Sequence, residues 1–295
     1  MGHEWFSNIL LPFRVVEQNG VWVDDIIPET SRSWSFTAEW DSHTDRVGDI
    51  TWDYSAKDRL RQFYLETRIG RDEVREKLLL DAGCGNGLLT QALAKAGAKS
   101  IGVDLQRNLP GHLSNDAPQF VLTNFLNLPF KEECFDIVIA NGSLHHTPST
   151  KHAFFQIAKH IKPTGKFYVW LYKRPDGWKN KVLLFCLDLT RQIICRLPMK
   201  IQHQIVLWLS HFFFWLSRKR SGANTKRSFE QIRINIYDAF TPRYRHYHRP
   251  EEVAHWFHAC GFDPPILTHW NNKYGFGMVA ERNFPDKNSP GENFI

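Results

Sequence analysis

Short, continuous apolar runs alternate with helical patterns through the middle of the chain. After the first run, at 77–82, Leu88, Leu89, Ala92 and Leu93 recur at the spacing of one helix face. Further runs follow at 100–105, 119–123, 135–141 and 165–172. Unbroken apolar runs of this length are typical of parallel strands that are covered on both faces. Strands that alternate with helices predict a doubly wound, mostly parallel sheet.

Two later helical stripes and two further strand-like segments complete this pattern. Phe154, Ile157, Ala158 and Ile161 predict a helix that stops at Pro163 and Gly165. Pro250 opens another helix, with Val253, Trp256, Phe257 and Cys260 on one face and Gly261 at its end. Strand-like segments at 266–271 and 275–281 then predict an antiparallel hairpin. We therefore expect an α/β fold with a Rossmann-like, seven-stranded sheet.

Two long parts of the chain lie outside this predicted sheet. Residues 1–76 form an N-terminal extension with a lead-in helix, which Ser55 caps. Residues 174–249 separate the fifth strand from the last helix, where such a sheet needs only a short connection. The sequence thus predicts a core at 77–173, an insertion at 174–249, a C-terminal part of the core at 250–282 and a loose tail at 283–295.

The positive charge of the chain is concentrated in one stretch. The formal net charge of the 295 residues is +6, and residues 218–249 hold nine Lys or Arg against two acidic residues. Such a stretch attracts an anionic molecule or membrane surface, or forms an ordinary solvated face. The five cysteines lack metal-ligand spacing, and the N-terminus lacks the pattern of a secretory signal. We expect a cytoplasmic protein, with peripheral membrane contact as one reading of the basic stretch, and no metal site.

Three alternate glycines follow the first strand. Gly83, Gly85 and Gly87 lie in the first strand-to-helix turn, which is the usual place for a nucleotide-like ligand in this kind of sheet. Leu88 stands where a dinucleotide fingerprint requires glycine, and the Gly-Lys-Ser/Thr of a P-loop is absent. Asp81 would repel a phosphate but suits a ligand with an amino group or other positive charge.

A second acid, Asp104, ends the next strand, 23 residues after Asp81. A carboxylate at this place accepts hydrogen bonds from ribose hydroxyls. One acid for a cationic amino-acid group and one for a ribose describe S-adenosylmethionine. The chain resembles the class I S-adenosylmethionine-dependent methyltransferases, in particular the branch with the ubiquinone and menaquinone biosynthesis enzymes and other small-molecule methyltransferases. The stretches "LDAGCGNG", "GVDL", "TNFLNLPFKEECFDIVIANGSLHHTP" and "IKPTGKFYVW" carry this resemblance.

The resemblance implies a set of cofactor-binding residues. Asn124 would bond the adenine amino group, Phe125 would pack on the adenine ring, and Asn141 would line the methionine end. The whole set that the family motifs imply is Asp81, Gly83, Cys84, Gly85, Gly87, Asp104, Leu105, Asn124, Phe125 and Asn141. The implied cofactor is S-adenosylmethionine.

Several histidines and tyrosines are candidates for contact with the acceptor. His145 and His146 follow the fourth strand, and a neutral imidazole there could remove a proton from the acceptor. Either ring could instead pack against the cofactor or cap the following helix. Tyr237, Tyr244 and His246 lie in the basic stretch and either line an acceptor pocket or belong to an exposed loop.

The insertion holds two very apolar segments, at 181–197 and 201–220. Polar residues interrupt both segments, so neither reads as a membrane span. A hairpin of two helices could cover the active site, lie in a membrane interface or form a channel for an apolar acceptor.

Two classes of function agree with the sequence. The first is methyl transfer to a small, amphiphilic or anionic acceptor at O, N or C; RNA or protein acceptors are a further alternative. The motif after the fourth strand, "NGSLHH", lacks the prolines of base-methylating enzymes, so we do not expect a nucleic-acid substrate. The second class is a noncatalytic scaffold of the same fold at a membrane or partner protein.

Overall fold

The computed structural model contains the predicted α/β sheet. It describes residues 4–12, 14–26, 50–51, 54–106, 108–111, 118–221, 228–268 and 274–283. Apart from Asn283, the predicted tail therefore lies outside the described residues. Strands β5 (Leu78–Ala82), β6 (Lys99–Asp104), β7 (Gln119–Leu122), β8 (Phe135–Asn141) and β9 (Ile161–Tyr172) run parallel. Strands β11 (Gly275–Glu281) and β10 (Ile266–Leu267) continue the sheet in antiparallel fashion.

The order of these seven strands is β7-β6-β5-β8-β9-β11-β10. The chain first builds outward from β5 in one direction and then continues on the other side with β8. The crevice beyond β5 is therefore the topological switch point, where such sheets bind ligands. The fold class predicted from the sequence is confirmed.

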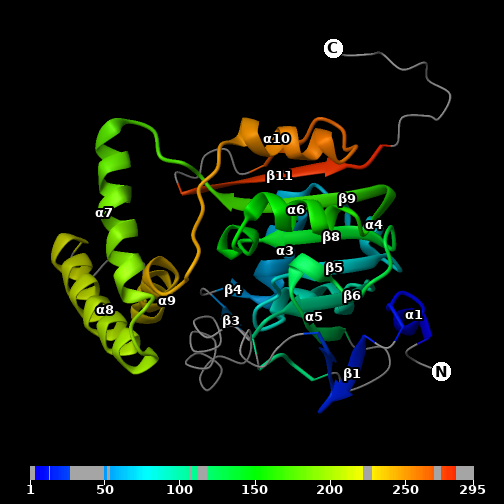
Figure 1. Ribbon diagram of the computed structural model, residues 1–295, viewed down its shortest axis with the longest axis horizontal. Coiled ribbons are helices and arrows are strands. Elements are labelled where there is room, and N and C mark those ends of the chain that lie inside the picture. The colour runs from blue at the N-terminus through cyan, green and yellow to red at the C-terminus, as the bar shows by residue number, and fades with distance from the viewer. Residues whose placement is uncertain are drawn as a thin grey trace.

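Helices cover both faces of the sheet (Figure 1). Helices α3 (Ala56–Thr67) and α5 (Leu88–Lys95) pack on one face, and α6 (Thr150–Ala158) and α10 (Pro250–Ala259) on the other. Adjacent residues of β5 enter opposite cores, since Leu79 packs with Phe63 of α3 and Leu80 belongs to the cluster around Phe154 of α6. This two-sided burial explains why the strands read as continuous apolar runs. Ser55 caps α3 as predicted, in a capping box with Asp58.

The sheet has nine strands instead of the predicted seven, because the N-terminal extension adds two. Strands β1 (Val15–Gln18) and β2 (Val21–Asp24) form a hairpin, and β2 pairs in parallel with β7. Each is only four residues long, which is too short for a clear alternating pattern. The remaining elements of the extension are α1 (Glu4–Ser7), β3 (Ile50–Thr51), β4 (Tyr54–Ser55) and α4 (Arg71–Val74).

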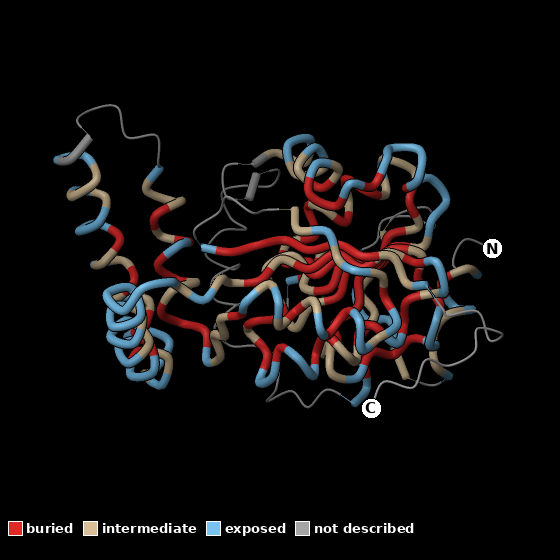
Figure 2. The backbone as a smooth tube through the Cα atoms, turned by 90° about the horizontal axis from the view of Figure 1, so that it is seen from above, coloured by how far each residue is buried: buried red, intermediate tan, exposed pale blue. Residues whose placement is uncertain are grey.

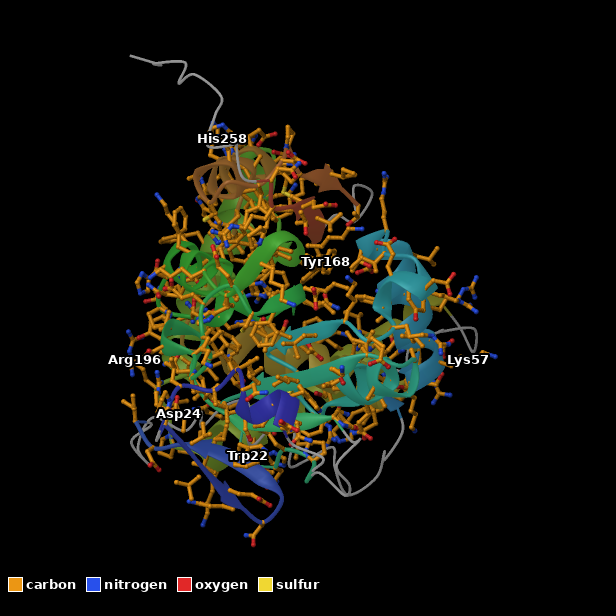
Figure 3. The ribbon with its side chains drawn as sticks, turned by 90° about the vertical axis from the view of Figure 1, so that its right-hand side faces the viewer. Trp22, Asp24, Lys57, Tyr168, Arg196 and His258 are labelled. Atoms are coloured by element: carbon orange, nitrogen blue, oxygen red, sulfur yellow. The ribbon has the colours of Figure 1, made fainter. Side chains whose placement is uncertain are left out.

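Specific polar contacts fasten this hairpin to the edge of the sheet. Trp22 donates a hydrogen bond to the side chain of Gln119 at 3.0 Å, and buried Asp24 accepts one from Thr123 at 2.7 Å. Figure 3 shows Trp22 and Asp24 on the hairpin. The Arg14 guanidinium lies 2.8 Å from the Asp24 carboxylate and donates a hydrogen bond to the main-chain carbonyl of Asn127 at 2.7 Å. The extension therefore supports the loop that follows β7.

The boundary between α6 and β9 differs from the prediction. The helix ends at Ala158, and Ile161 already belongs to β9, where it pairs with Phe135. A register shift between Phe135 and Ile137 lets the strand accommodate the Pro163 turn. The spacing of Ile161 fits the apolar stripe of the helix, but its backbone is extended. Periodicity alone does not distinguish these two conformations.

The insertion forms three helices instead of the predicted hairpin of two. Helices α7 (Trp178–Ile194), α8 (Met199–Ser221) and α9 (Phe229–Phe240) lie beyond the carboxyl ends of the parallel strands, to one side of the buried sheet (Figures 1 and 2). Helices α7 and α8 pack against α9, around a small core of their own that includes Ile194, Val206 and Ile236. Among the described helices, none combines the length and hydropathy that a bilayer crossing requires.

Candidate functional site

Four loops meet where β5, β6, β7 and β8 end. They are the glycine turn at 83–87, the residues from Asp104 to Gln106, the short helix η2 (Phe125–Asn127) and the segment that leads into η3 (Leu144–His146). Because parallel strands end at the same edge of a sheet, residues far apart in sequence come together here. All the residues predicted to bind the cofactor lie in or beside these loops.

The glycine turn has the backbone that the sequence predicts. Gly83, Gly85 and Gly87 have φ angles of +87°, +55° and +73°, a region that side chains disfavour. The structure adds a reason that the sequence did not show. A Cβ on Gly83 would lie 2.2 Å from the Cβ of Ser143, and one on Gly87 would lie 2.5 Å from the ring of Phe120. At these two positions glycine is required by the protein's own packing.

The Asp104 carboxylate holds this turn in place. It accepts a hydrogen bond from the main-chain N–H of Gly85 at 2.9 Å and another from that of Gln106 at 3.0 Å. The side-chain amide of Gln106 also donates to the carbonyl of Gly85. The Oε1 atom of the same amide is buried without a hydrogen-bond partner in the part of the chain that the structure describes. This corner therefore presents both a carboxylate and an unused amide oxygen.

Asp81 is buried directly behind the turn. Only 3% of the residue is exposed, and its carboxylate accepts a hydrogen bond from the hydroxyl of Thr90 at 2.7 Å. Burial, together with the nearby Asp104, raises the pKa of Asp81 to about 6. Burial also raises the pKa of Asp104 above its ordinary value. The hydrogen bond from Thr90 and the charge of Arg59 oppose the shift at Asp81, but burial outweighs them. Two desolvated acids at one crevice favour a ligand that brings a positive charge.

The other predicted cofactor residues lie along the same edge. Asn124 caps η2 by accepting a hydrogen bond from the N–H of Leu126 at 3.0 Å, and the tip of the Phe125 ring lies against Gly83. Asn141 ends β8 beside Trp170. The side chain of Cys84 packs in the core near Phe120, so Cys84 can offer a ligand its main chain only. Leu105 follows Asp104 and is partly exposed.

His146 is held between two oxygen atoms. Its Nδ1 atom lies 3.0 Å from the carbonyl of Tyr244, and its Nε2 atom lies 3.1 Å from a carboxylate oxygen of Asp238, at the end of α9. A carbonyl accepts hydrogen bonds only, and so does an ionised carboxylate. Both ring nitrogens of His146 therefore face acceptor oxygens, and neither is directed at an open position.

Asp238 stays ionised in spite of its burial. Burial favours the neutral acid, but the hydrogen bond and charge of His146 and the charge of Arg245 outweigh it, so the pKa of Asp238 lies below its ordinary value. The hydroxyl of Tyr172 also donates to this carboxylate, and the Arg245 guanidinium lies 4.7 Å from the centre of the Tyr172 ring. Motif reading did not reveal Tyr172 or Arg245, because only the fold brings β9, α9 and the following loop together.

His145 has the opposite environment. It is fully buried, and neither ring nitrogen has a hydrogen-bond partner among the described residues. Its ring centre lies 4.0 Å from that of Tyr172 and 4.3 Å from that of His146. Burial lowers the pKa of His145 well below its ordinary value, and the neighbouring positive charges of His146 and Arg245 lower it further. His145 is therefore a neutral imidazole with a nitrogen lone pair available.

The structure separates the three residues that were predicted to contact the acceptor. Tyr237 is buried in the core of the insertion, where its hydroxyl contacts His203. Tyr244 lies beside η3, since its carbonyl faces His146. His246 hydrogen-bonds to the carbonyl of Thr147 at 3.0 Å, and its N–H donates to the carbonyl of His145 at 3.0 Å. Tyr244 and His246 thus fasten the loop after α9 to η3, whereas Tyr237 packs with α8.

Comparison with known proteins agrees with this geometry. Residues 80–169 match the family described as "Methyltransferase domain". A ubiquinone biosynthesis O-methyltransferase of Coxiella burnetii is 36% identical over 115 residues, which cover 37% of this chain and 48% of that protein. Residues 80–169 form a class I S-adenosylmethionine-dependent methyltransferase domain. The chain spans about half the length of this curated relative.

Other relatives have different activities in their names. The mouse mitochondrial arginine-hydroxylase NDUFAF5 is 32% identical over 130 residues, covering 39% of this chain and 37% of that protein. A probable human tRNA methyltransferase 9B is 32% identical over 124 residues, which cover 40% of this chain and 25% of that protein. The solved magnesium protoporphyrin IX methyltransferase of Synechocystis, with bound S-adenosylhomocysteine, is 16% identical with a TM-score of 0.48, covering 84% of this chain and 96% of that one. The shared domain therefore does not identify the acceptor.

We predict that Asp81→Asn stabilises the free protein at neutral pH. The pKa of Asp81 is raised from 3.8 to about 6, so between these values the folded state keeps a proton that the unfolded chain has lost. The free energy of unfolding therefore decreases as pH rises through this window, and it stays reduced at higher pH. The substitution removes this loss of stability, which reaches up to about 3 kcal/mol at pH ~7.

Urea unfolding at about pH 7 and about pH 3 measures the effect. The gain should nearly vanish at the lower pH, which lies below the pKa of Asp81 in both the folded and the unfolded state. Asp72→Asn, on exposed α4, is the matched control and should change little. A loss of stability at pH ~7 in Asp81→Asn would show that the buried carboxylate is not under electrostatic strain.

A second prediction concerns His145. Because burial and the neighbouring charges lower its pKa, nitrogen chemical shifts should show a neutral His145 imidazole at about pH 5 as well as at about pH 7. The variant His145→Gln assigns its signals. A doubly protonated His145 at pH ~5 would contradict this prediction.

Proposed function

We propose that the protein transfers a methyl group from S-adenosylmethionine to a small amphiphilic or anionic acceptor, at an O, N or C atom. The observation that carries this proposal is the pair of acids, buried Asp81 and half-buried Asp104, beside the glycine turn of a methyltransferase domain. S-adenosylmethionine carries an ammonium and a sulfonium group, and its ribose has two hydroxyls to donate. The positive charge would stabilise the two carboxylates, and the hydroxyls would donate to their oxygen atoms.

The residues present fit the cofactor in three places. Asp81, on the floor of the turn, would attract the ammonium group of the methionine part. Asp104 and the unpartnered Oε1 atom of Gln106 would accept hydrogen bonds from the ribose hydroxyls. Asn124 and Phe125 would flank the adenine, and Arg14 of the N-terminal extension supports their loop through the carbonyl of Asn127. When bound, the cofactor supplies an activated methyl group on a sulfonium centre.

Methyl transfer needs little more from the protein than alignment, and a base where the acceptor must lose a proton. We assign that base to His145, because it is neutral and both of its ring nitrogens are unpartnered. His146 serves a different purpose. Paired with Asp238, it lowers the pKa of His145 and would hold the loop after β8 in place.

The character of the acceptor follows from what surrounds these histidines. Arg245 and His146 supply positive charge, and the apolar helices of the insertion lie at the same end of the sheet (Figure 1). An acceptor with an acidic or phenolic group and an apolar tail suits this combination. The ubiquinone biosynthesis O-methyltransferase relative is consistent with such a small molecule. We do not propose a nucleic-acid acceptor.

The cofactor part of the proposal is tested by calorimetry with S-adenosylhomocysteine. We expect the unaltered protein to bind it, and Asp104→Asn to weaken binding at least about tenfold, since a ribose hydroxyl loses a charged acceptor, worth about 1.5–3 kcal/mol. Asp136→Asn, at the far end of β8, is the control for loss of a carboxylate. Absence of measurable binding to the unaltered protein would favour a noncatalytic scaffold.

Turnover is tested with methyl-labelled S-adenosylmethionine and a panel of phenols and carboxylic acids with alkyl tails of increasing length. We expect labelled products, and we expect the KM for the acceptor to fall as its tail lengthens. In His145→Gln, kcat should decrease by at least roughly 100-fold. Unchanged turnover in His145→Gln would remove it as the base. Cofactor binding without transfer to any member of the panel would contradict the proposed acceptor class.

A further inference from the structure

Helices α7 and α8 present an unusually large apolar surface to solvent. On α7, Trp178, Val182, Phe185, Leu189 and Ile193 follow one another at steps of three or four residues, and each is at least half exposed. This spacing places them along one face of the helix. We call them, together with the exposed aromatic residues Trp208, Phe212 and Trp215 of α8, the apolar face.

The opposite sides of the same helices already have their partners within the chain. Arg191 and Ile194 are the buried residues of α7, and Arg191 donates to the carbonyls of Pro242 and Arg243. Val206 and Ser210 of α8 are completely buried. The apolar face is therefore a second apolar surface, which packing against α9 does not require. A patch of this kind on a soluble protein marks an interaction site.

The charges around the apolar face are mostly positive. Residues 176–219 hold seven Lys or Arg and two acids, Asp176 and Asp188. Asp188 is paired with Arg191 at 2.7 Å. The free cations stand next to the aromatic rings, since Lys179 lies 5.7 Å from the centre of the Trp178 ring and Lys219 lies 5.2 Å from that of Trp215. Tryptophan rings and lysines side by side are typical of helices that lie in a membrane interface.

We propose that the apolar face binds the surface of a bilayer that contains anionic lipids. The helices would lie in the interface, since none of the described helices meets the requirements of a bilayer crossing. Each large apolar side chain that leaves water favours attachment, and each basic residue near an anionic surface adds to it. The two contributions together favour reversible attachment.

A second copy of the chain is a less suitable occupant of the apolar face. Two such faces in a symmetric dimer would bring lysines and arginines of the same sign together, because a twofold interface repeats the same patch on both subunits. Repulsion between like charges opposes that contact, whereas anionic lipid headgroups attract the same residues. Charge complementarity therefore favours the bilayer.

The apolar face is also mechanically connected to the candidate site. Arg191 of α7 holds the carbonyls that follow α9, and α9 carries Asp238, the partner of His146. Attachment to a bilayer would therefore place an element that contacts the candidate site near the lipid. Membrane binding itself does not depend on methyl transfer, so this inference goes beyond the proposed function and its failure would leave that function intact.

Co-sedimentation of the full chain with lipid vesicles tests the inference. One set of vesicles contains phosphatidylcholine alone, and the other contains phosphatidylcholine with phosphatidylglycerol. We expect binding to the anionic vesicles, weakened by salt, and little binding to the neutral ones. Tryptophan fluorescence should shift to shorter wavelength on binding, because Trp178, Trp208 and Trp215 leave water.

Two variants test the two components. The double variant Phe185→Ser/Trp208→Ser should weaken binding at least tenfold, and Lys179→Glu/Lys219→Glu should abolish the preference for anionic lipid. The controls are Leu65→Ser, an exposed apolar residue of α3, and Lys57→Glu, also on α3 (Figure 3). Circular dichroism and cofactor affinity, which should not change, show that the variants are folded.

Three results would overturn the proposal. They are no binding of the unaltered protein to either kind of vesicle, equal loss of binding in the control variants, or a stable dimer in solution that Phe185→Ser/Trp208→Ser dissociates. The last result would assign the apolar face to a second copy of the chain.

Discussion

The contact on which the candidate site depends is the pair of hydrogen bonds from the main-chain N–H groups of Gly85 and Gln106 to the Asp104 carboxylate. It ties the turn after β5 to the end of β6, so that two strands present their ends as one surface. The positive φ angles of the glycines make the turn tight enough to reach this carboxylate. The arrangement leaves Asp104 and Asp81 desolvated together, which is costly for an empty site and favourable once a cation binds.

The insertion completes the electrostatics of the other half of the site. Asp238 comes from α9, yet it pairs with His146, which lies in the loop after β8. His146 and Arg245 in turn lower the pKa of the adjacent His145. A helical addition outside the parallel sheet therefore contributes directly to the surroundings of both histidines. The same addition carries the apolar face, for which we propose lipid binding.

The sequence predicted the sheet well because buried parallel strands leave continuous apolar runs, as at 135–141 and 275–281, whose bounds match β8 and β11. It did not predict the hairpin β1–β2, whose strands are short and stand at the sheet edge. Ile161 was misplaced because its spacing fits a helix while its pairing with Phe135 is long-range. The environments of His145, His146 and Tyr237 depend on contacts between distant segments, which a linear motif does not contain. Gly83 shows the same limit, since its neighbour is Ser143.

The central claim is that Asp81 and Asp104 form a desolvated acidic floor for a cationic ligand. Titration of S-adenosylhomocysteine at about pH 6, in buffers of different ionisation enthalpy, measures the protons exchanged on binding. Because the ammonium group of the ligand lowers the pKa of Asp81 from its free value of about 6, binding should release a fraction of a proton there and almost none at pH ~8. Proton uptake at pH ~6, or binding with no proton exchange at either pH, would contradict the account.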